Sequence, residues 1–152
     1  MHIVLVEPEI PANTGNIART CAVTGSSLHL VRPLGFSTAD KYLKRAGLDY
    51  WHLVEVLYYD SFQEVVESHP GGCFYLVTTK APRRYCQVTY QPDSFLVFGK
   101  ETRGLSPEIL NSAPEKQIRI PMVEEARSLN LANAVAVVLF EALRQQGFRG
   151  LK

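Results

Sequence analysis

Short apolar runs alternate with helix-like segments along the chain, and this alternation constrains the fold more than any other feature. Strand-like runs rich in β-branched and aromatic residues occupy residues 2–6, 28–31, 53–59, 73–79, 94–99 and 116–121. Capping residues and helical patterns predict helices over residues 13–24, 37–47, 61–68, 106–110 and 128–146. Strands that alternate with helices predict an α/β fold with one parallel sheet covered on both faces.

Polar segments follow four of the strand-like runs. They come after residues 2–6, 73–79, 94–99 and 116–121. Because parallel sheets bind ligands at the carboxyl ends of their strands, we expect one site to assemble from these loops.

The composition fits one folded domain over residues 1–152. Of the 152 residues, 46% are hydrophobic, which is enough for a core and argues against disorder. A net charge of +1 argues against charge-driven nucleic-acid binding of the histone type, but it does not exclude local basic patches.

The three cysteines are Cys21, Cys73 and Cys86, and none belongs to a CxxC pair. Neither a disulfide framework nor a zinc site is therefore expected, and we expect no metal. The sequence has no signal peptide and no apolar run long enough to cross a bilayer. Together these features predict a protein of the reducing cytoplasm that does not bind membranes.

Common catalytic motifs receive little support. GKET at residues 99–102 lacks the upstream glycine of a phosphate loop, and PANTGNIAR has one glycine instead of GxGxxG. No HExxH or GxSxG is present. The four histidines are scattered along the sequence, so we interpret each as structural or exposed.

The last predicted helix is apolar on nearly every side. A core stripe runs at helical spacing through Ala132, Val135, Ala136, Leu139 and Leu143, while Val137, Val138 and Phe140 make the other faces apolar too. A helix that is apolar all round is buried on both sides. We therefore predict a subunit interface, with a purely intramolecular core as the alternative.

The segment at residues 8–25 combines Asn13 at a predicted helix start with Arg19 among apolar neighbours. An N-cap and a surface arginine are the alternative interpretation.

In another segment, residues 118–136, Pro121 ends a strand and the loop enters the last helix near Ser128. A helix cap by Ser128 is the alternative interpretation, and it is compatible with a contact to a ligand.

The segment at residues 96–109 places Gly99 and Gly104 on either side of a charged turn. Glycines there let the backbone approach a flat ligand closely. An ordinary turn with an ion pair between Glu101 and Arg103 explains the residues equally well.

In this order, NTGNIAR, FGKETRGL and IPMVEEARSLNLANAVA resemble the three motifs of the SPOUT class of RNA methyltransferases. They match its 2′-O-methylating branch and are most similar to the members that act on the wobble nucleotide of tRNA. The similarity includes RAGLDYW and TTKAP and so covers essentially the whole chain. All three motifs in one short chain are far more specific than any one of them.

The resemblance implies properties that the pattern alone does not give. These are a deep trefoil knot in the C-terminal third, a homodimer, and a site for S-adenosylmethionine within the knot. The implied cofactor site includes Val77, Gly99, Ile120 and Ser128, with Leu76, Thr78, Met122, Leu129 and Asn130 nearby. Positions implicated in catalysis in the family match Asn13, Arg19, Glu101, Ser128 and Asn130.

The implied reaction transfers a sulfonium methyl to the ribose 2′-hydroxyl of cytidine or modified uridine 34 in tRNA, with leucine isoacceptors as substrates and S-adenosylhomocysteine as product. The protein mainly has to position and deprotonate that hydroxyl. Arg19 matches the arginine proposed to activate it. Because a guanidinium does not readily lose its proton, we expect Arg19 to hold the nucleotide phosphate and stabilise developing alkoxide charge.

Basic residues gather in two segments that suit an anticodon stem-loop. One carries Lys80, Arg83 and Arg84, with no acidic residue from 68 to 92, and the other carries Lys41, Lys44 and Arg45. Arginine and tyrosine can stack on unpaired bases. Solvated loops are the alternative interpretation.

Two other functions remain open. One is a SPOUT enzyme acting on ribosomal RNA or on another tRNA position, and the other is a non-catalytic flavodoxin-like binding domain. Arg127 fits either an RNA contact or an ion pair with Glu124 or Glu125.

Overall fold

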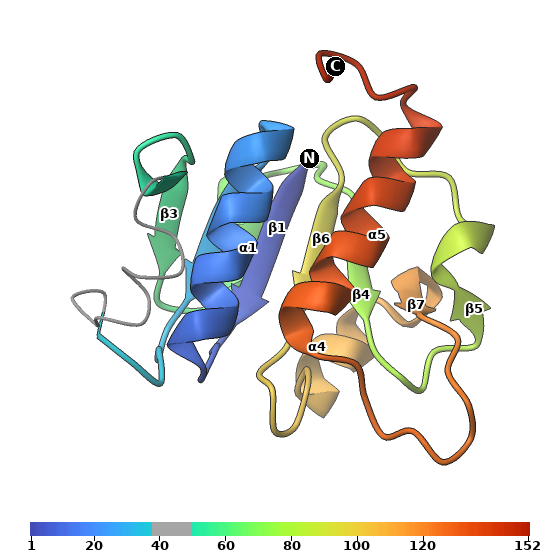
Figure 1. The fold of residues 1–152 in the computed structure, drawn as a ribbon. Helices are drawn as coiled ribbons and strands as arrows, with labels where there is room; N and C mark the ends of the chain where they lie inside the picture. Colours follow the sequence, from blue (N-terminus) through green and yellow to red (C-terminus); the bar gives the residue numbers. More distant parts are fainter. Residues whose placement is uncertain (38–49) are drawn as a thin grey trace.

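The computed structural model describes residues 1–37 and 50–152, so the helix predicted over residues 37–47 lies outside it apart from Ser37. Within the described residues, one sheet has the strand order β3-β2-β1-β6-β4-β7-β5, and its paired neighbours are all parallel (Figure 1). The strands are β1 (His2–Val6), β2 (Ser27–Val31), β3 (Val56–Tyr59), β4 (Phe74–Val77), β5 (Arg83–Arg84), β6 (Phe95–Phe98) and β7 (Gln117–Arg119). The predicted parallel α/β sheet is confirmed.

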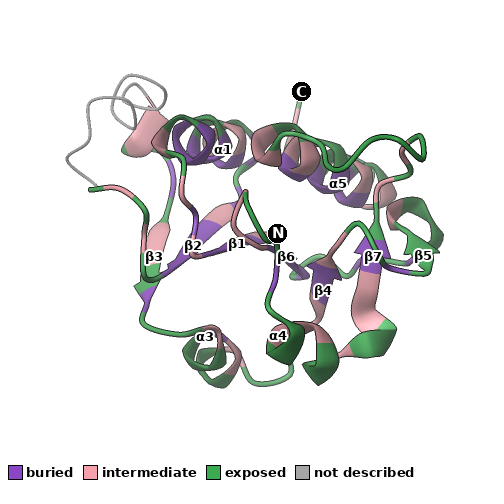
Figure 2. Ribbon diagram, turned by 90° about the horizontal axis from the view of Figure 1, so that it is seen from below, coloured by how far each residue is buried: buried purple, intermediate pink, exposed green. Residues whose placement is uncertain are grey.

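Helices cover both faces of the sheet. Figure 2 shows α1 (Pro11–Thr24) and α5 (Leu131–Gln145) on one face, and α3 (Phe62–Ser68) and α4 (Pro107–Ser112) on the other. Single-turn 3₁₀ helices follow β5 and precede β7. In the described residues, no helix has the length and apolarity needed to cross a membrane.

The central strand β1 is apolar on both sides. Ile3 and Leu5 pack into the core beneath α1 and α5, whereas Val4 and Val6 pack into a second core on the opposite face. This division follows from the strand itself, since successive side chains point to opposite faces. Two cores separated by one buried sheet are what the continuous apolar run predicts.

Strand β3 is shorter than predicted. Leu53 and Val54 do not join the sheet, because they donate their backbone N–H groups to the carbonyls of Tyr50 and Trp51, whereas the Glu55 carbonyl accepts the N–H of Leu28 in β2. The apolar pattern there reflects the burial of Val54 and not strand pairing.

Helix α1 begins earlier than predicted. It starts at Pro11, and Ile10 holds the N-cap position without a side-chain hydrogen bond, so neither Asn13 nor Thr14 caps the helix. Proline suits a first helical position because its missing N–H has no helical partner there. The C-terminal end agrees with prediction, since Gly25 follows the helix with a left-handed φ of 64°.

Helix α5 begins later than predicted. Its N-cap is Asn130, whose Oδ1 accepts the N–H groups of Ala132 and Asn133, and the alternative of a cap by Ser128 is wrong. Serine and asparagine both suit an N-cap position, so contacts elsewhere in the chain decide which of the two residues caps the helix.

The buried face of α5 differs in part from the predicted stripe. Val135, Leu139 and Leu143 are buried as expected, and Val138 and Ala142 join them. Ala132 and Ala136 are only partly buried, whereas Val137 and Phe140 are exposed.

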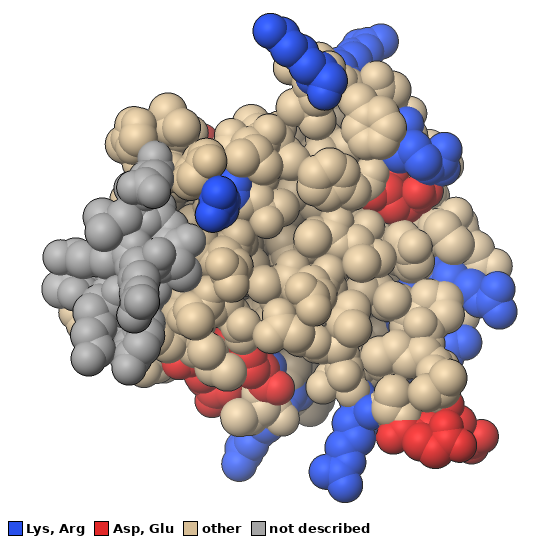
Figure 3. Space-filling model, in the orientation of Figure 1, with Lys and Arg blue, Asp and Glu red and all other residues tan. Residues whose placement is uncertain are grey.

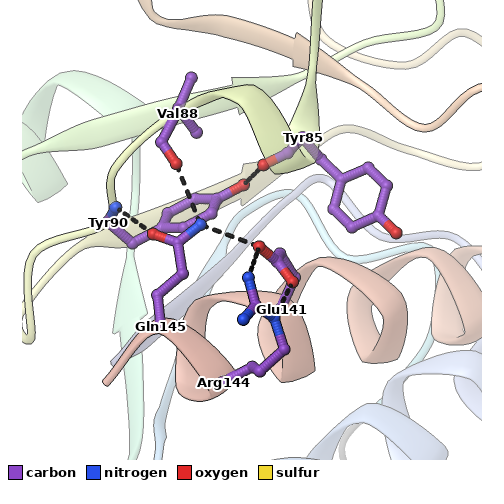
Figure 4. Close-up of polar contacts among 6 residues, drawn as sticks. All are labelled: Tyr85, Val88, Tyr90, Glu141, Arg144 and Gln145. Carbon is purple, nitrogen blue, oxygen red and sulfur yellow. Dashed lines mark hydrogen bonds and ion pairs between the residues drawn. The ribbon is translucent and has the colours of Figure 1, made fainter. Parts of the chain in front are cut away.

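The C-terminal end of α5 clamps the segment that follows β5 (Figure 4). The Gln145 amide accepts the backbone N–H of Tyr90 at 3.0 Å and donates to the Val88 carbonyl at 3.0 Å. The same amide donates to Glu141, which Arg144 holds through two further hydrogen bonds. This network fixes residues 85–90 against the helix.

Candidate active site

A cavity of about 730 Å³ lies where β4, β6 and β7 end and α5 begins. Its walls come from the loops after these three strands, and Ile10 and Asn13 contribute from the region after β1. The four loops expected to form a site therefore surround one cavity. Its volume falls within the range of about 300–1,000 Å³ that is typical of small-molecule sites.

The predicted cofactor positions line this cavity with one exception. The lining positions are Val77, Thr78, Gly99, Ile120, Met122, Ser128, Leu129 and Asn130. Leu76 is the exception, since its side chain is fully buried in the core on the α3 side of the sheet. Alternation along β4 explains the difference, because Leu76 and Val77 point to opposite faces.

The loop after β6 folds back over its own first glycine. Gly104 donates its N–H to the Lys100 carbonyl at 2.8 Å and has a φ of 69°. A Cβ atom on Gly99 would lie only 2.0 Å from the Gly104 carbonyl carbon. Gly99 is therefore required for the loop to close, and the closed loop forms one wall of the cavity.

A polar network joins the three motif segments. The Glu101 carboxylate accepts the N–H groups of Glu9 and Ile10 at 2.8 and 3.2 Å, and the Asn13 amide at 3.0 Å. Asn13 in turn accepts a hydrogen bond from the Asn130 amide at 3.0 Å. Both oxygens of Glu101 are thus engaged with the protein, and Glu101 does not form the alternative ion pair with Arg103.

A second set of contacts fastens the same loops and was not predicted. The Glu9 carboxylate accepts the backbone N–H and the hydroxyl of Thr102, at 3.1 and 2.8 Å. Lys100 forms an ion pair with Glu7. A carboxylate between two prolines, as in the sequence EPEIP, was the available signal for Glu9. The loops after β1 and β6 therefore hold each other in place.

Arg19 does not line the cavity. It lies on the exposed side of α1, with its guanidinium carbon 4.6 Å from the centre of the Tyr50 ring. Its Nη2 donates to the Tyr50 hydroxyl at 3.4 Å. Among the five predicted catalytic residues, the structure gathers Asn13, Glu101, Ser128 and Asn130 at the cavity and leaves Arg19 outside.

Four positive side chains line the cavity. They belong to Lys80, Lys100, Arg103 and Arg127. Within residues 1–37 and 50–152, the ion pairs include none between Arg127 and Glu124 or Glu125. Arg127 therefore belongs to the cavity wall.

The predicted RNA contacts are only partly brought together. Arg83 and Arg84 form the edge strand β5, and Arg84 lies beside Arg119 of β7, a basic neighbour that sequence reasoning missed. Arg119 sits between two isoleucines, where its alternation with buried residues was the signal for an exposed side chain. Lys41, Lys44 and Arg45 lie outside the described residues.

The buried thiol and histidines have structural roles. Burial raises the pKa of the Cys21 thiol to about 12, so this group is protonated near neutral pH. His2, His29 and His69 are distant in sequence but pack together around Phe95. Burial lowers the pKa of His29 to about 3, which keeps its ring neutral in the core.

Fold and site together define an α/β protein of the RNA-methylase type. The model of the SpoU rRNA methylase family matches residues 1–140, and the chain belongs to this family. The predicted resemblance is therefore confirmed.

Two relatives of similar length make the similarity more specific. The tRNA (cytidine(34)-2′-O)-methyltransferase of Escherichia coli (strain K12) is 48% identical over 151 residues, covering 99% of this chain and 96% of that protein. The protein of the same name from Polaromonas sp. (strain JS666 / ATCC BAA-500) is 51% identical over 152 residues, covering 98% and 93%.

Solved structures agree with both the fold and the family. A structure described as giving insights into the 2-OH methylation of C/U34 on tRNA matches with a TM-score of 0.92 and 44% identity, covering 97% of each chain. An AdoMet-bound rRNA methyltransferase from Sinorhizobium meliloti matches with a TM-score of 0.84 and 25% identity, covering 94% of this chain and 55% of that one.

Proposed function

We propose that this protein transfers a methyl group from S-adenosylmethionine to the ribose 2′-hydroxyl of the wobble nucleotide of tRNA, cytidine or uridine 34. The observation that carries this proposal is the Glu101–Asn13–Asn130 network, which joins all three motif segments at one cavity. Full-length relatives named for this reaction support the choice of substrate. We extend the proposal to leucine isoacceptors as substrates and to the cytoplasm as the place of action.

The cavity residues fit S-adenosylmethionine. Apolar walls at Val77, Ile120 and Leu129 would pack against the adenine ring, and the hydroxyls of Thr78 and Ser128 can hydrogen-bond to polar groups. The positive side chains at the cavity suit the carboxylate of the methionine part. When bound, the cofactor supplies a methyl group on an electrophilic sulfonium. The trefoil knot that the family implies around this site stays a prediction.

The residues of the network position the site and do not take the proton. Glu101 is an unsuitable base for the ribose hydroxyl, because its oxygens already accept three hydrogen bonds. Arg19 offers a guanidinium that is suited to hold a phosphate and stabilise an alkoxide. The 2′-hydroxyl proton therefore passes to solvent water as charge develops on the oxygen beside the Arg19 guanidinium.

A homodimer would bring Arg19 to a cavity. The outer surface of α1 and α5 exposes apolar side chains, with Val23, Val137 and Phe140 being 53%, 36% and 44% exposed. Figure 3, oriented as Figure 1, shows that the centre of this face consists mostly of uncharged side chains, with charges mainly at its rim. We propose that two copies pack through this face and that Arg19 of one serves the cavity of the other.

RNA contacts complete the proposal. Lys80 at the cavity, Arg83 and Arg84 on β5, and Arg119 beside them are suited to bind the phosphates of an anticodon stem-loop.

Nucleoside mass spectrometry of unmodified tRNA after incubation with the protein and S-adenosylmethionine tests the function. We expect 2′-O-methylcytidine or 2′-O-methyluridine at the wobble position. Methylation at another tRNA position, or of ribosomal RNA alone, would refute the proposed substrate. Calorimetry distinguishes the proposed enzyme from the non-catalytic alternative. Binding of flavin, with none of S-adenosylmethionine or its demethylated product, would support a flavodoxin-like domain.

Mixed dimers test the role of Arg19. Arg19→Ala should lower kcat about 100-fold, as removal of a charge-stabilising donor does, while cofactor affinity stays close to wild type. A dimer of one Arg19→Ala chain and one Asn130→Ala chain, co-expressed with different tags, should regain activity. One intact cavity then receives the Arg19 of the other chain. No recovery would indicate that Arg19 acts within its own protomer.

The interface has its own test. Phe140→Glu should give a monomer in sedimentation velocity, because a carboxylate cannot be buried there without a partner. Val123→Glu is the matched control, since Val123 is 71% exposed and lies outside α1 and α5. A monomeric wild-type protein would refute the dimer.

A further inference from the structure

A shallow recess lies next to the cavity wall, where β2 and β3 end. It has a volume of about 520 Å³ and is lined by Arg32, Pro33, Leu34, Phe36 and Asp60. Three of these side chains are apolar and two form an ion pair. The recess is separate from the cavity, since the two have no lining residue in common.

A fixed arginine forms one wall of the recess. The Arg32 guanidinium carbon lies 5.5 Å from the centre of the Tyr58 ring, and Nη1 donates to Asp60 Oδ1 at 2.8 Å. The Arg32 backbone N–H also bonds to the Tyr59 carbonyl, which extends the pairing of β2 with β3. The ring and the carboxylate therefore hold the guanidinium in one orientation.

The carboxylate is anchored as well. Asp60 donates its backbone N–H to Glu64 Oε2 at 2.7 Å, and Ser61 caps the helix that follows. The Asp60 side chain is 84% exposed, and its Oδ2 atom has no protein donor among the hydrogen bonds of the described residues. An exposed carboxylate oxygen is a hydrogen-bond acceptor for a ligand.

One backbone segment links the recess to the cavity. Gly35, between two residues of the recess, donates its N–H to the Pro8 carbonyl at 2.9 Å, and a Cβ atom on it would lie 2.7 Å from Glu9 Cα. Glu9 in turn holds Thr102 in the cavity wall. The recess is therefore connected to the cavity wall through residues 8 and 9.

We propose that this recess binds an unpaired base of the substrate RNA, one that carries an exocyclic amino group, next to the nucleotide that is methylated; this subsite rests on the proposed function. The base stacks on the Arg32 guanidinium and the apolar wall, and its amino group donates to Asp60. Arginine planes are established platforms for unpaired RNA bases.

The charge balance selects a base and not a phosphate. Arg32 is neutralised by Asp60 at 2.8 Å, and a phosphate would meet the carboxylate as a like charge. Amino groups of cytosine and adenine are donors, and acidic side chains accept from the cytosine amino group in nucleic-acid complexes. Apolar Pro33, Leu34 and Phe36 suit a flat ring.

Stem-loop RNAs in which each loop base in turn is replaced by an abasic site test this inference. Binding is measured by fluorescence anisotropy. For the wild-type protein, one abasic position next to the wobble nucleotide should weaken binding about tenfold, within the range known for loss of a stacked base. Arg32→Ala should weaken binding of the intact RNA by a similar factor and should make the protein insensitive to that abasic position. Additive losses at every position would overturn the proposal.

Two further variants sharpen the test. Arg32→Lys keeps a positive charge beside Asp60 but lacks the flat guanidinium, so it should behave like Arg32→Ala. Asp60→Asn should abolish the preference for an amino-bearing base over uracil at the coupled position. Arg149→Ala, which removes an exposed arginine in the C-terminal tail, should bind every RNA as the wild type does.

The outcomes distinguish failure of the recess proposal from failure of the proposed function. Methylation of tRNA without any coupling to Arg32 refutes the recess and leaves the function standing. Coupling in the binding assay without methylation supports the recess and refutes the function. Calorimetry should give the same affinity for S-adenosylmethionine in Arg32→Ala and wild type, and a loss there would assign Arg32 to the fold.

Discussion

Amide side chains fasten both ends of α5, yet the two ends have different consequences. At the N-terminal end, Asn130 caps the helix and donates to Asn13, which is bound to Glu101. At the C-terminal end, Gln145 bonds to Tyr90, Val88 and Glu141.

The partners make the difference. Asn130, Asn13 and Glu101 all line the cavity and come from three motif segments, so their bonds determine where the loops stand. Tyr90 and Gln145 do not line it, and their bonds fix a surface segment to the helix. Amide hydrogen bonds thus position the site at the N-terminal end of α5 and support only the fold at its C-terminal end.

The largest expected effect comes from Asn130→Asp. An aspartate still caps the helix but cannot donate to Asn13, and its carboxylate would face the Asn13 oxygen. We expect kcat/KM to fall about 100-fold, since small displacements of positioning groups have such effects. The free energy of unfolding, measured with urea, should change by less than about 1 kcal/mol.

Asn130→Ala separates the two roles further. It removes both the cap and the donor, so it should lose activity similarly and also lose about 1 kcal/mol of stability. Activity retained in Asn130→Asp would mean that the bond to Asn13 does not position the site.

The second effect is on stability alone. Gln145→Ala leaves the Tyr90 N–H and the Val88 carbonyl without their partner, and we expect a loss of about 1–3 kcal/mol in urea unfolding. At a temperature where the variant is folded, kcat/KM should stay within about twofold of wild type, because surface and support positions away from a site leave its geometry intact. Gln146→Ala is the matched control, since that amide makes one bond, to the Tyr90 carbonyl. A fall in activity with Gln145→Ala would remove the contrast between the ends.

The sequence predicts the sheet well because its signals are local. Apolar runs such as residues 2–6 and 94–99 identify buried strands whatever surrounds them. The two-residue strand β5 has no such signal. Arg83 and Arg84 are exposed, and they form a strand only because β7 offers a free edge.

The motifs predicted most of the residues that the structure places at the cavity, but not the hydrogen bonds between them. The motifs identified Asn13, Glu101 and Asn130, yet local patterns assigned the two caps to the wrong residues. Asn130 caps α5 while reaching Asn13, which lies 117 positions away in sequence. A contact of that range depends on the finished fold. Arg19 likewise matched its motif, whereas its place outside the cavity required the structure.

The smallest effect concerns pH at the C-terminal end. Hydrogen bonds from Arg144 lower the pKa of Glu141 below its ordinary value of 4.5. A carboxylate with a lowered pKa stabilises the fold above its unfolded pKa, and this contribution is lost as the pH falls through the folded pKa. At pH 7, Glu141→Gln should therefore cost about 1 kcal/mol, as expected for an ion pair whose arginine side chain is 62% exposed.

Urea unfolding of Glu141→Gln and wild type between pH 7 and pH 3 checks this dependence. The difference between the two proteins should be constant above the unfolded-state pKa of the carboxyl and should shrink as the pH falls through its lowered folded-state pKa, because wild-type Glu141 then takes up a proton. Arg144→Ala should follow the same course, since it removes the other partner of the pair. A difference that does not shrink as the pH falls would mean that Glu141 contributes through packing and not through its charge.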